Sequence, residues 1–328
     1  MPFHLPRRKF QAVTPPPAGG CASSHLRLQH GTTIVLTAML FFLRAEAAFV
    51  TNTPSADASL MEVAPNNNNG AQAFVLSGRT QNGPRVRALY QFDLTNLPTN
   101  ATVLSVTLEL HVTGQPIDGL ANAPFGLHRM LRPWGEGDKN PISPPGQGLP
   151  ASPGEVTWLH SFHPTNAWTV PGGAAGEDYY GFESAFQFIY GIGESPYRFE
   201  STTELVTDVQ GWVNNPAANF GWMLICAEEE TIFTGRRFNS REDMNAPPTL
   251  EIEYLVPPRI EAITRDAAQV QFSFITWPGQ SYTVEVRDSP MTGSWQTLTN
   301  VGTAAASAPV VITDTITQPQ RFYRVVSY

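Results

Sequence analysis

Residues 205–254, LVTDVQGWVNNPAANFGWMLICAEEETIFTGRRFNSREDMNAPPTLEIEY, contain the pattern that decides the fold. The stretch begins with apolar side chains at spacings of three and four, which is typical of a short helix packed down on one face. These side chains are Leu205, Val206, Val209, Trp212 and Val213. The helix is expected to end at Asn214, Asn215 and Pro216, because proline lacks a backbone N–H and disfavours a helical residue before it.

Three strands are predicted after this helix. Residues 220–227 form a nearly continuous apolar run, which is typical of a strand covered on both faces. Residues 236–242, if extended, place Arg237, Asn239 and Arg241 on one face, because side chains alternate along a strand. Residues 250–254 alternate apolar and acidic side chains, so this closing strand is expected to be half buried.

The composition of the whole chain favours an all-β protein. Its 328 residues are 41% hydrophobic and 15% charged, and they include 29 Pro and 26 Gly. Turn residues at this density separate many short strands, and the length is enough for two domains with full cores. Apolar or alternating runs predict further strands at 73–76, 86–94, 103–112 and 125–131.

Residues 1–47 are predicted to be a signal peptide. Basic residues precede an apolar run at 34–43, and Ala45, Glu46 and Ala47 form a small-x-small cleavage site. An uncleaved membrane anchor is the alternative, but a bilayer span needs about 20 apolar residues. The mature protein is therefore expected to be secreted or held at the cell surface, and not embedded in a membrane.

Charge and cysteine content bear on the partners of the mature chain. Cleavage after residue 47 leaves 15 basic and 27 acidic residues, a net charge of −12. Nucleic acid is therefore not expected as a partner, because phosphate binding requires a basic face. Cys226 is the only cysteine after residue 47, and its place in an apolar strand predicts a packing role.

Two long stretches are predicted to be loops, and a proline pair separates two domains. Residues 135–154 form a Gly- and Pro-rich loop that is either functional or disordered, and residues 171–200 are expected to cross the top of a sandwich. Pro257 and Pro258 divide the predicted domains, 48–256 and 257–328. The second domain resembles a small fibronectin type III or immunoglobulin-like β-sandwich, with strands at 268–276, 281–288, 295–299, 309–313 and 322–326.

Several short motifs occur in a fixed order between residues 50 and 255. They include RALYQFDL at 87–94, WGEG at 134–137, DVQGW at 208–212, NPAANFGW at 215–222 and RFNSRE at 237–242. Together they resemble the DNRLRE domain, whose relatives include carbohydrate-binding module family 96. This resemblance implies a jelly-roll β-sandwich of secreted bacterial and archaeal proteins, some of which bind acidic polysaccharide such as alginate.

Sugar recognition directs attention to one strand and to the loop aromatics. A pyranose needs an aromatic surface for its apolar face and planar groups for its hydroxyls, and arginine suits a carboxylate. The candidate ligand-binding residues are therefore Arg237, Asn239, Arg241, Trp134, Trp158, Trp168 and Tyr179. The structural alternative is that these tryptophans fill the ends of the sandwich and that Arg241 pairs with Glu136 or Asp208. Trp212 and Trp222 are expected in the core.

Signals for a cofactor or for catalysis are weak. His160 and His163 have a spacing that zinc sites sometimes use, but side chains three apart on an extended segment point to opposite faces. No cofactor is expected other than a structural calcium ion held by loop oxygens such as those of Asp138 and Asn140. Hydrolysis needs two placed carboxylates, and the chain has no nucleophile elbow or phosphate loop, so no enzyme activity is predicted.

The sequence therefore favours a secreted, non-catalytic module that binds polysaccharide, acidic alginate-like polymers included. A purely structural or adhesion role in a cell-surface or matrix assembly is the second hypothesis. A polysaccharide lyase or hydrolase is the third, and it lacks an identifiable catalytic group.

Overall fold

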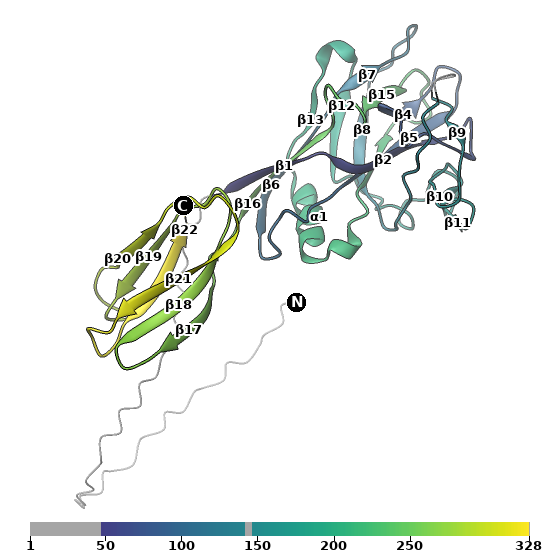
Figure 1. Ribbon diagram of the computed structural model, residues 1–328. Helices are drawn as coiled ribbons and strands as arrows, with labels where there is room; N and C mark the ends of the chain where they lie inside the picture. Colours follow the sequence, from purple (N-terminus) through teal and green to yellow (C-terminus); the bar gives the residue numbers. More distant parts are fainter. Residues whose placement is uncertain (1–46, 142–145, 328) are drawn as a thin grey trace, which may run out of the picture. The chain divides into compact units, whose positions relative to one another are not determined.

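The structure is a computed structural model that describes residues 47–141 and 146–327. The predicted signal peptide, residues 1–47, lies outside the described residues except for Ala47. The described chain consists of antiparallel β-sheets with short helices between them, which confirms the all-β class (Figure 1). Within these ranges, no helix has both the length and the apolar character needed to cross a bilayer.

Residues 48–255 form a sandwich of two antiparallel sheets (Figure 1). The smaller sheet has the order β1 (Ala48–Asn52), β16 (Thr249–Leu255), β6 (Thr102–Leu110) and β13 (Tyr197–Phe199). The larger sheet has the order β12 (Ala185–Ile189), β8 (Ala123–Arg129), β14 (Trp222–Cys226), β5 (Arg85–Phe92), β4 (Phe74–Arg79), β15 (Arg236–Asn239) and β7 (Val112–Gly114). In addition, β2 (Pro54–Met61) pairs with β5.

The helix α1 (Thr203–Asn214) lies where the apolar spacing predicts it. The Thr202 hydroxyl caps its start by accepting the backbone N–H of Leu205 at 3.0 Å. A 3₁₀ turn, η2 (Pro216–Ala218), follows its end. Leu205 and Trp212 are buried in the main core between the two sheets, so tertiary packing holds this short helix in place.

The strand β14 is buried on both faces, as its apolar run predicts. Trp222 and Leu224 belong to the main core, whereas Met223 and Ile225 belong to a second hydrophobic cluster on the opposite face. We call this opposite face of the larger sheet the outer face. Much of it is covered by residues 131–179, here called the loop layer, whose residues 142–145 are not described.

Short elements brace the loop layer and the segment after it. β3 (Asn67–Asn68) pairs with β9 (Leu149–Pro150), and β10 (His160–Phe162) pairs with β11 (Asn166–Ala167). A 3₁₀ turn, η1 (Ile192–Glu194), connects β12 with β13. The loop layer is therefore a folded cover of the sheet, held by few regular backbone pairs.

Three features of the sandwich differ from the sequence predictions. β1 and β2 precede the first predicted strand, and their sequences, AFVTN and PSADASLM, show no regular alternation of apolar and polar side chains. β12 and β13 lie within residues 171–200, which were expected to be loop. β15 stops at Asn239 instead of continuing to residue 242, because the chain turns where the Arg241 N–H donates to Asp57 Oδ2 at 2.7 Å.

Residues 260–327 form a smaller sandwich of two three-stranded sheets. One sheet has the order β17 (Ile260–Arg265), β18 (Gln269–Thr276) and β21 (Ala308–Thr315), and the other β20 (Gln296–Val301), β19 (Tyr282–Arg287) and β22 (Phe322–Ser327). The predicted strands are confirmed to within a few residues, and β17 is the additional one. Phe272 and Phe274 from one sheet pack with Tyr282 and Val284 from the other.

Candidate functional site

The aromatic side chains predicted to bind a ligand are buried in the loop layer. Trp134, Trp158, Trp168 and Tyr179 are only 7%, 3%, 4% and 8% exposed, and all four belong to the cluster on the outer face. Trp134 Nε1–H donates to the Phe220 carbonyl, and Trp168 Nε1–H donates to the Thr157 carbonyl, both at 2.9 Å. Their rings are packed on the outer face of the larger sheet and present no open stacking surface, so they have a packing role, although they do not fill the ends of the sandwich as the structural alternative expected.

The polar residues of the predicted arginine strand do not share one open face. Asn239 is fully buried, where its side chain accepts the His111 N–H at 3.0 Å and donates to the Ala246 carbonyl. The Arg237 guanidinium lies over the Phe74 ring, 4.6 Å from its centroid. Arg241 lies beyond the end of β15. The predicted shared face is therefore wrong for Arg241, because it assumed a strand three residues longer, whereas Arg237 and Asn239 are two residues apart on β15.

Arg241 closes a buried acidic cluster, and its Nε lies 2.6 Å from Glu136 Oε1 and 2.9 Å from Glu242 Oε1. Asp57, which is 1% exposed, donates its N–H to Glu136 at 2.8 Å and accepts the Arg241 N–H at 2.7 Å. Desolvation raises the pKa of Asp57 well above its usual value, and it also raises the pKa of Glu136. The cluster ties β2 to the segments around residues 136 and 241, which is the structural alternative for Arg241.

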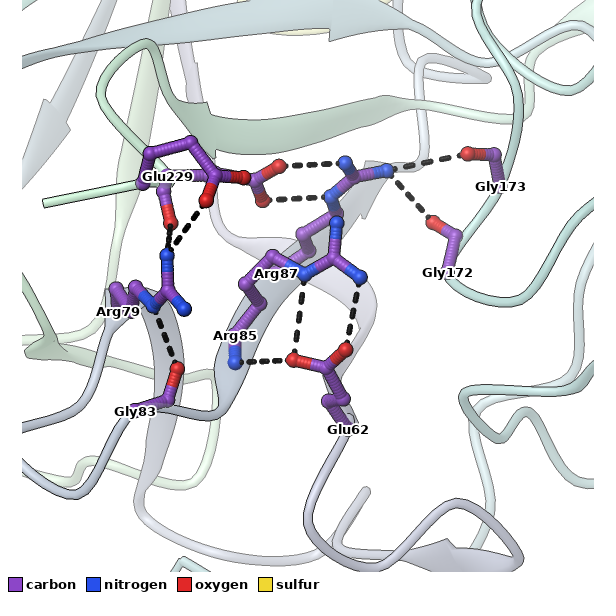
Figure 2. A network of polar contacts seen from close by, with 9 residues as sticks. Glu62, Arg79, Gly83, Arg85, Arg87, Gly172, Gly173 and Glu229 are labelled. Carbon is purple, nitrogen blue, oxygen red and sulfur yellow. Dashed lines mark hydrogen bonds and ion pairs between the residues drawn. The ribbon is translucent and has the colours of Figure 1, made fainter. Parts of the chain in front are cut away.

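A second polar network on the outer face contains three arginines that the sequence analysis did not select (Figure 2). Arg87 makes a two-pronged ion pair with Glu229, at 2.7 and 2.6 Å, and donates to the carbonyls of Gly172 and Gly173 at 2.9 and 3.2 Å. These bonds join β5 to the loop layer. The Arg87 guanidinium also lies 5.9 Å from the centroid of Trp158.

The other two arginines of this network are also neutralised (Figure 2). Arg85 binds both oxygens of Glu62 through Nη2 and Nε, at 2.7 and 3.2 Å, and this hydrogen bonding lowers the pKa of the Glu62 carboxyl. Arg79 pairs with Glu230 at 2.8 Å and donates to the Gly83 carbonyl at 2.6 Å. Three arginines therefore face three glutamates, so the network has no excess positive charge to offer an acidic polymer.

An exposed row of aromatic side chains lies along the edge strand β12. Phe186 is 58% exposed and Phe188 is 47% exposed, and both point to the outer face because Ala185 and Ile189 point into the main core. Two residues apart on a strand, their side chains are separated by about 6.6 Å. We call this row, with its exposed neighbours, the aromatic strip; its members are Tyr180, Phe182, Phe186, Phe188 and Tyr190.

The neighbouring strand β8 has residues with small side chains opposite the aromatic strip, and the Glu183 side chain covers one of them. Phe186 lies opposite Gly126 on β8, and Phe188 lies opposite Pro124. The Glu183 side chain folds over Gly126, where an added Cβ would lie 2.6 Å from Glu183 Cγ. His128, two residues further along β8, meets the Tyr180 carbonyl at 3.1 Å, and burial lowers its pKa. The strip is therefore bordered by a carboxylate and an uncharged imidazole.

The sequence contains one signal for this strip. The segment AFQFI at 185–189 has an aromatic residue at every second position, which is compatible with a strand inside a stretch expected to be loop. Alternation alone does not show which of the two faces stays uncovered. Only the position of the loop layer, which leaves β12 open, exposes the phenylalanines.

The residues considered as weak candidates for metal binding are placed as follows. The rings of His160 and His163 meet edge to face, with centroids 5.1 Å apart, so the expectation that they point to opposite faces is wrong. The short β10–β11 turn brings them together. Asp138, the calcium candidate, pairs with Lys139, which also bonds Glu155 at 2.8 Å. In the described ranges, no three His, Cys, Asp or Glu residues are arranged to hold a metal ion.

Comparison with known proteins adds no assignment to these observations. No protein-family model matches the chain, and no curated protein matches it.

Proposed function

We propose that this protein is a secreted, non-catalytic module that binds polysaccharide along the aromatic strip of its 48–255 sandwich. The observation that carries the proposal is the exposure of Phe186 and Phe188 on the outer face of an edge strand. Soluble proteins rarely leave a contiguous aromatic surface open unless it serves an interaction. The resemblance to the DNRLRE domain and to carbohydrate-binding module family 96 points in the same direction.

The chemistry of the strip suits a sugar chain. Flat rings about 6.6 Å apart along an extended strand offer successive contacts for the apolar faces of sugar rings. Glu183 beside them accepts hydrogen bonds from hydroxyl groups. The site is shallow, so the affinity of one site is expected to be weak and to grow with the length of the chain.

A neutral polysaccharide fits this surface better than an acidic one. The arginines of the network in Figure 2 are already paired with glutamates, and the strip itself is bordered by the carboxylate of Glu183. The mature chain would carry a net charge of −12, which repels a polyanion. We therefore place neutral glycans ahead of the alginate-like polymers that the family resemblance suggests.

A structural or adhesion role is the second candidate, because an aromatic patch on an edge strand also suits a protein partner. In that case the strip would contact another chain and would not retain a polysaccharide.

Affinity electrophoresis tests the proposal. The protein is run through native gels that contain a neutral soluble glucan, a xylan or alginate. The double variant Phe186→Ala/Phe188→Ala removes both outward rings, and Phe49→Ala removes a 72% exposed phenylalanine on β1 as a matched control. We expect retardation by a neutral glycan that the double variant loses and the control keeps, with unchanged thermal midpoints.

Two outcomes contradict the proposal. Unchanged migration in every gel would show that the protein binds none of these glycans, and it would favour the structural role. Equal retardation of the wild type and the double variant would show that the aromatic strip is not the glycan-binding site. A preference for alginate over both neutral polymers would overturn the ranking of ligands while keeping a glycan-binding function.

A further inference from the structure

A pocket of about 420 Å³ lies at one end of the 48–255 sandwich, and none of its lining residues belongs to the aromatic strip. It is bounded by the turn after β5, at residues 93–99, and by the end of α1 with η2. Small-molecule sites typically have volumes of about 300–1,000 Å³, so this pocket is large enough for a compact ligand.

The floor of the pocket is apolar and its rim is polar. Trp212, Leu94 and Leu97, all at most 8% exposed, form part of the floor and belong to the main core. Four of the exposed lining residues carry hydroxyl or carboxylate groups, namely Ser55, Asp93, Thr95 and Thr99, and the exposed Pro216 adds an apolar edge. An apolar floor below a ring of oxygen acceptors and donors matches a ligand with one apolar face and many hydroxyls.

The rim is held in place by its own hydrogen bonds. Asn219 donates to the Phe92 carbonyl at 2.8 Å, and Gln91 donates to the Asn219 carbonyl at 2.6 Å. Asp93 accepts the Thr95 N–H at 2.9 Å and the Thr95 hydroxyl at 3.0 Å, one on each carboxylate oxygen. Each carboxylate oxygen can still accept a further hydrogen bond. A ligand therefore meets a rim that is already ordered.

The charge of the rim selects the kind of ligand. Asp93 is the only charged residue among those that line the pocket, and no lining residue is basic. Sulfated, phosphorylated or uronic-acid groups would meet a carboxylate without a compensating cation. Hydroxyl groups, in contrast, donate to Asp93 and exchange hydrogen bonds with the threonines.

We propose that this pocket binds a single neutral pyranose ring, either as a free sugar or as the terminal residue of a chain, with its apolar face toward the exposed Pro216 at the edge of the apolar floor and its hydroxyls toward Asp93. This site is independent of the aromatic strip, which would bind the interior of a chain. Loss of binding at one site leaves the other intact.

The test is a titration of the ¹⁵N-labelled protein, followed by amide chemical shifts, with glucose, galactose, mannose or xylose as separate probes. For at least one sugar we expect amide chemical-shift changes that saturate with a millimolar dissociation constant and are confined to residues 91–99 and 212–219. Thr99→Phe fills the rim and is expected to weaken binding roughly tenfold or more. Asn100→Phe, an exposed neighbour outside the lining, is the matched control and is expected to bind normally.

The two proposed sites are distinguished by testing each variant in the assay of the other site. Phe186→Ala/Phe188→Ala should keep the pocket shifts, and Thr99→Phe should keep the gel retardation. The same titration is repeated with a polymer of the sugar that binds, at an equal concentration of chain ends. Equal shift changes for polymer and free sugar show that terminal residues of a chain enter the pocket. Absence of saturable shifts for every sugar, or equal shifts in Thr99→Phe, would overturn the pocket proposal without affecting the strip.

Discussion

Arg87 is expected to hold the loop layer on the outer face of the larger sheet. Replacing Arg87 tests how much this contact contributes to the stability of the protein. Its side chain is 10% exposed and that of Glu229 is 14% exposed, so their ion pair is largely removed from water (Figure 2). Arg87→Met keeps much of the aliphatic stem but removes four hydrogen bonds, two to Glu229 and two to the carbonyls of Gly172 and Gly173.

Arg85 provides a matched comparison on the same strand. It also binds its partner, Glu62, with two nitrogens, but the two side chains are 35% and 34% exposed. Removing one partner of a buried pair costs about 3–5 kcal/mol, because the other charge stays buried without compensation. A solvent-screened pair is worth about 0.2–1 kcal/mol. Arg87→Met is therefore expected to lower the free energy of unfolding several times more than Arg85→Met.

Urea denaturation followed by tryptophan fluorescence measures this difference, since urea is uncharged and does not screen the ion pairs. The double variant Arg87→Met/Glu229→Gln removes the stranded charge and is expected to recover part of the loss. Equal losses for Arg87→Met and Arg85→Met, or no recovery in the double variant, would refute the idea that burial of the pair holds the loop layer in place.

Two further predictions concern pH and backbone geometry. Burial raises the pKa of the Asp57 carboxyl, so the folded state holds the carboxyl proton more tightly than the unfolded state does. The contribution of this proton to folding stability is complete below about pH 4, and it is lost as pH rises through the folded-state pKa. Asp57→Asn should flatten this fall in urea midpoints measured from pH 4 to 8, and parallel wild-type and variant curves would contradict it. Gly221→Ala should destabilise the protein by more than 1 kcal/mol, because φ is +73° and the added Cβ would lie 1.9 Å from the Tyr90 carbonyl oxygen. Gly211 lies in α1, and a Cβ added there would meet no atom within 4 Å, so Gly211→Ala should stabilise the protein by roughly 0.5–1 kcal/mol in the same measurement. Similar effects at both positions would argue against the positive φ of Gly221.

Local periodicity was enough to predict much of the fold. The apolar spacing of residues 205–213 predicted α1, and the run at 220–227 predicted a strand buried on both faces, because each pattern matches a single backbone period. The strands of residues 260–327 followed from the same reasoning. β2 was missed, because its sequence lacks a regular apolar alternation, and Ala58 and Leu60 become buried through packing in the cluster on the outer face.

The candidate site could not be predicted in the same way. Trp158 and Trp168 are candidate ligand-binding residues by sequence, but a β-sheet with two apolar faces needs a second cover, and these rings supply it. The aromatic strip was missed for the complementary reason, because β12 lies where that cover ends.

The sequence by itself determined the helix, most of the strands and, where a strand was predicted with the right bounds, which of its residues share a face. Only the tertiary structure decided which distant segment covers each face, and therefore that Arg87 meets Glu229 while Phe186 stays open to solvent. The physical reason is that backbone periodicity is a local property, whereas covering a face and neutralising a charge depend on contacts between residues more than a hundred positions apart, as in the Arg87–Glu229 pair.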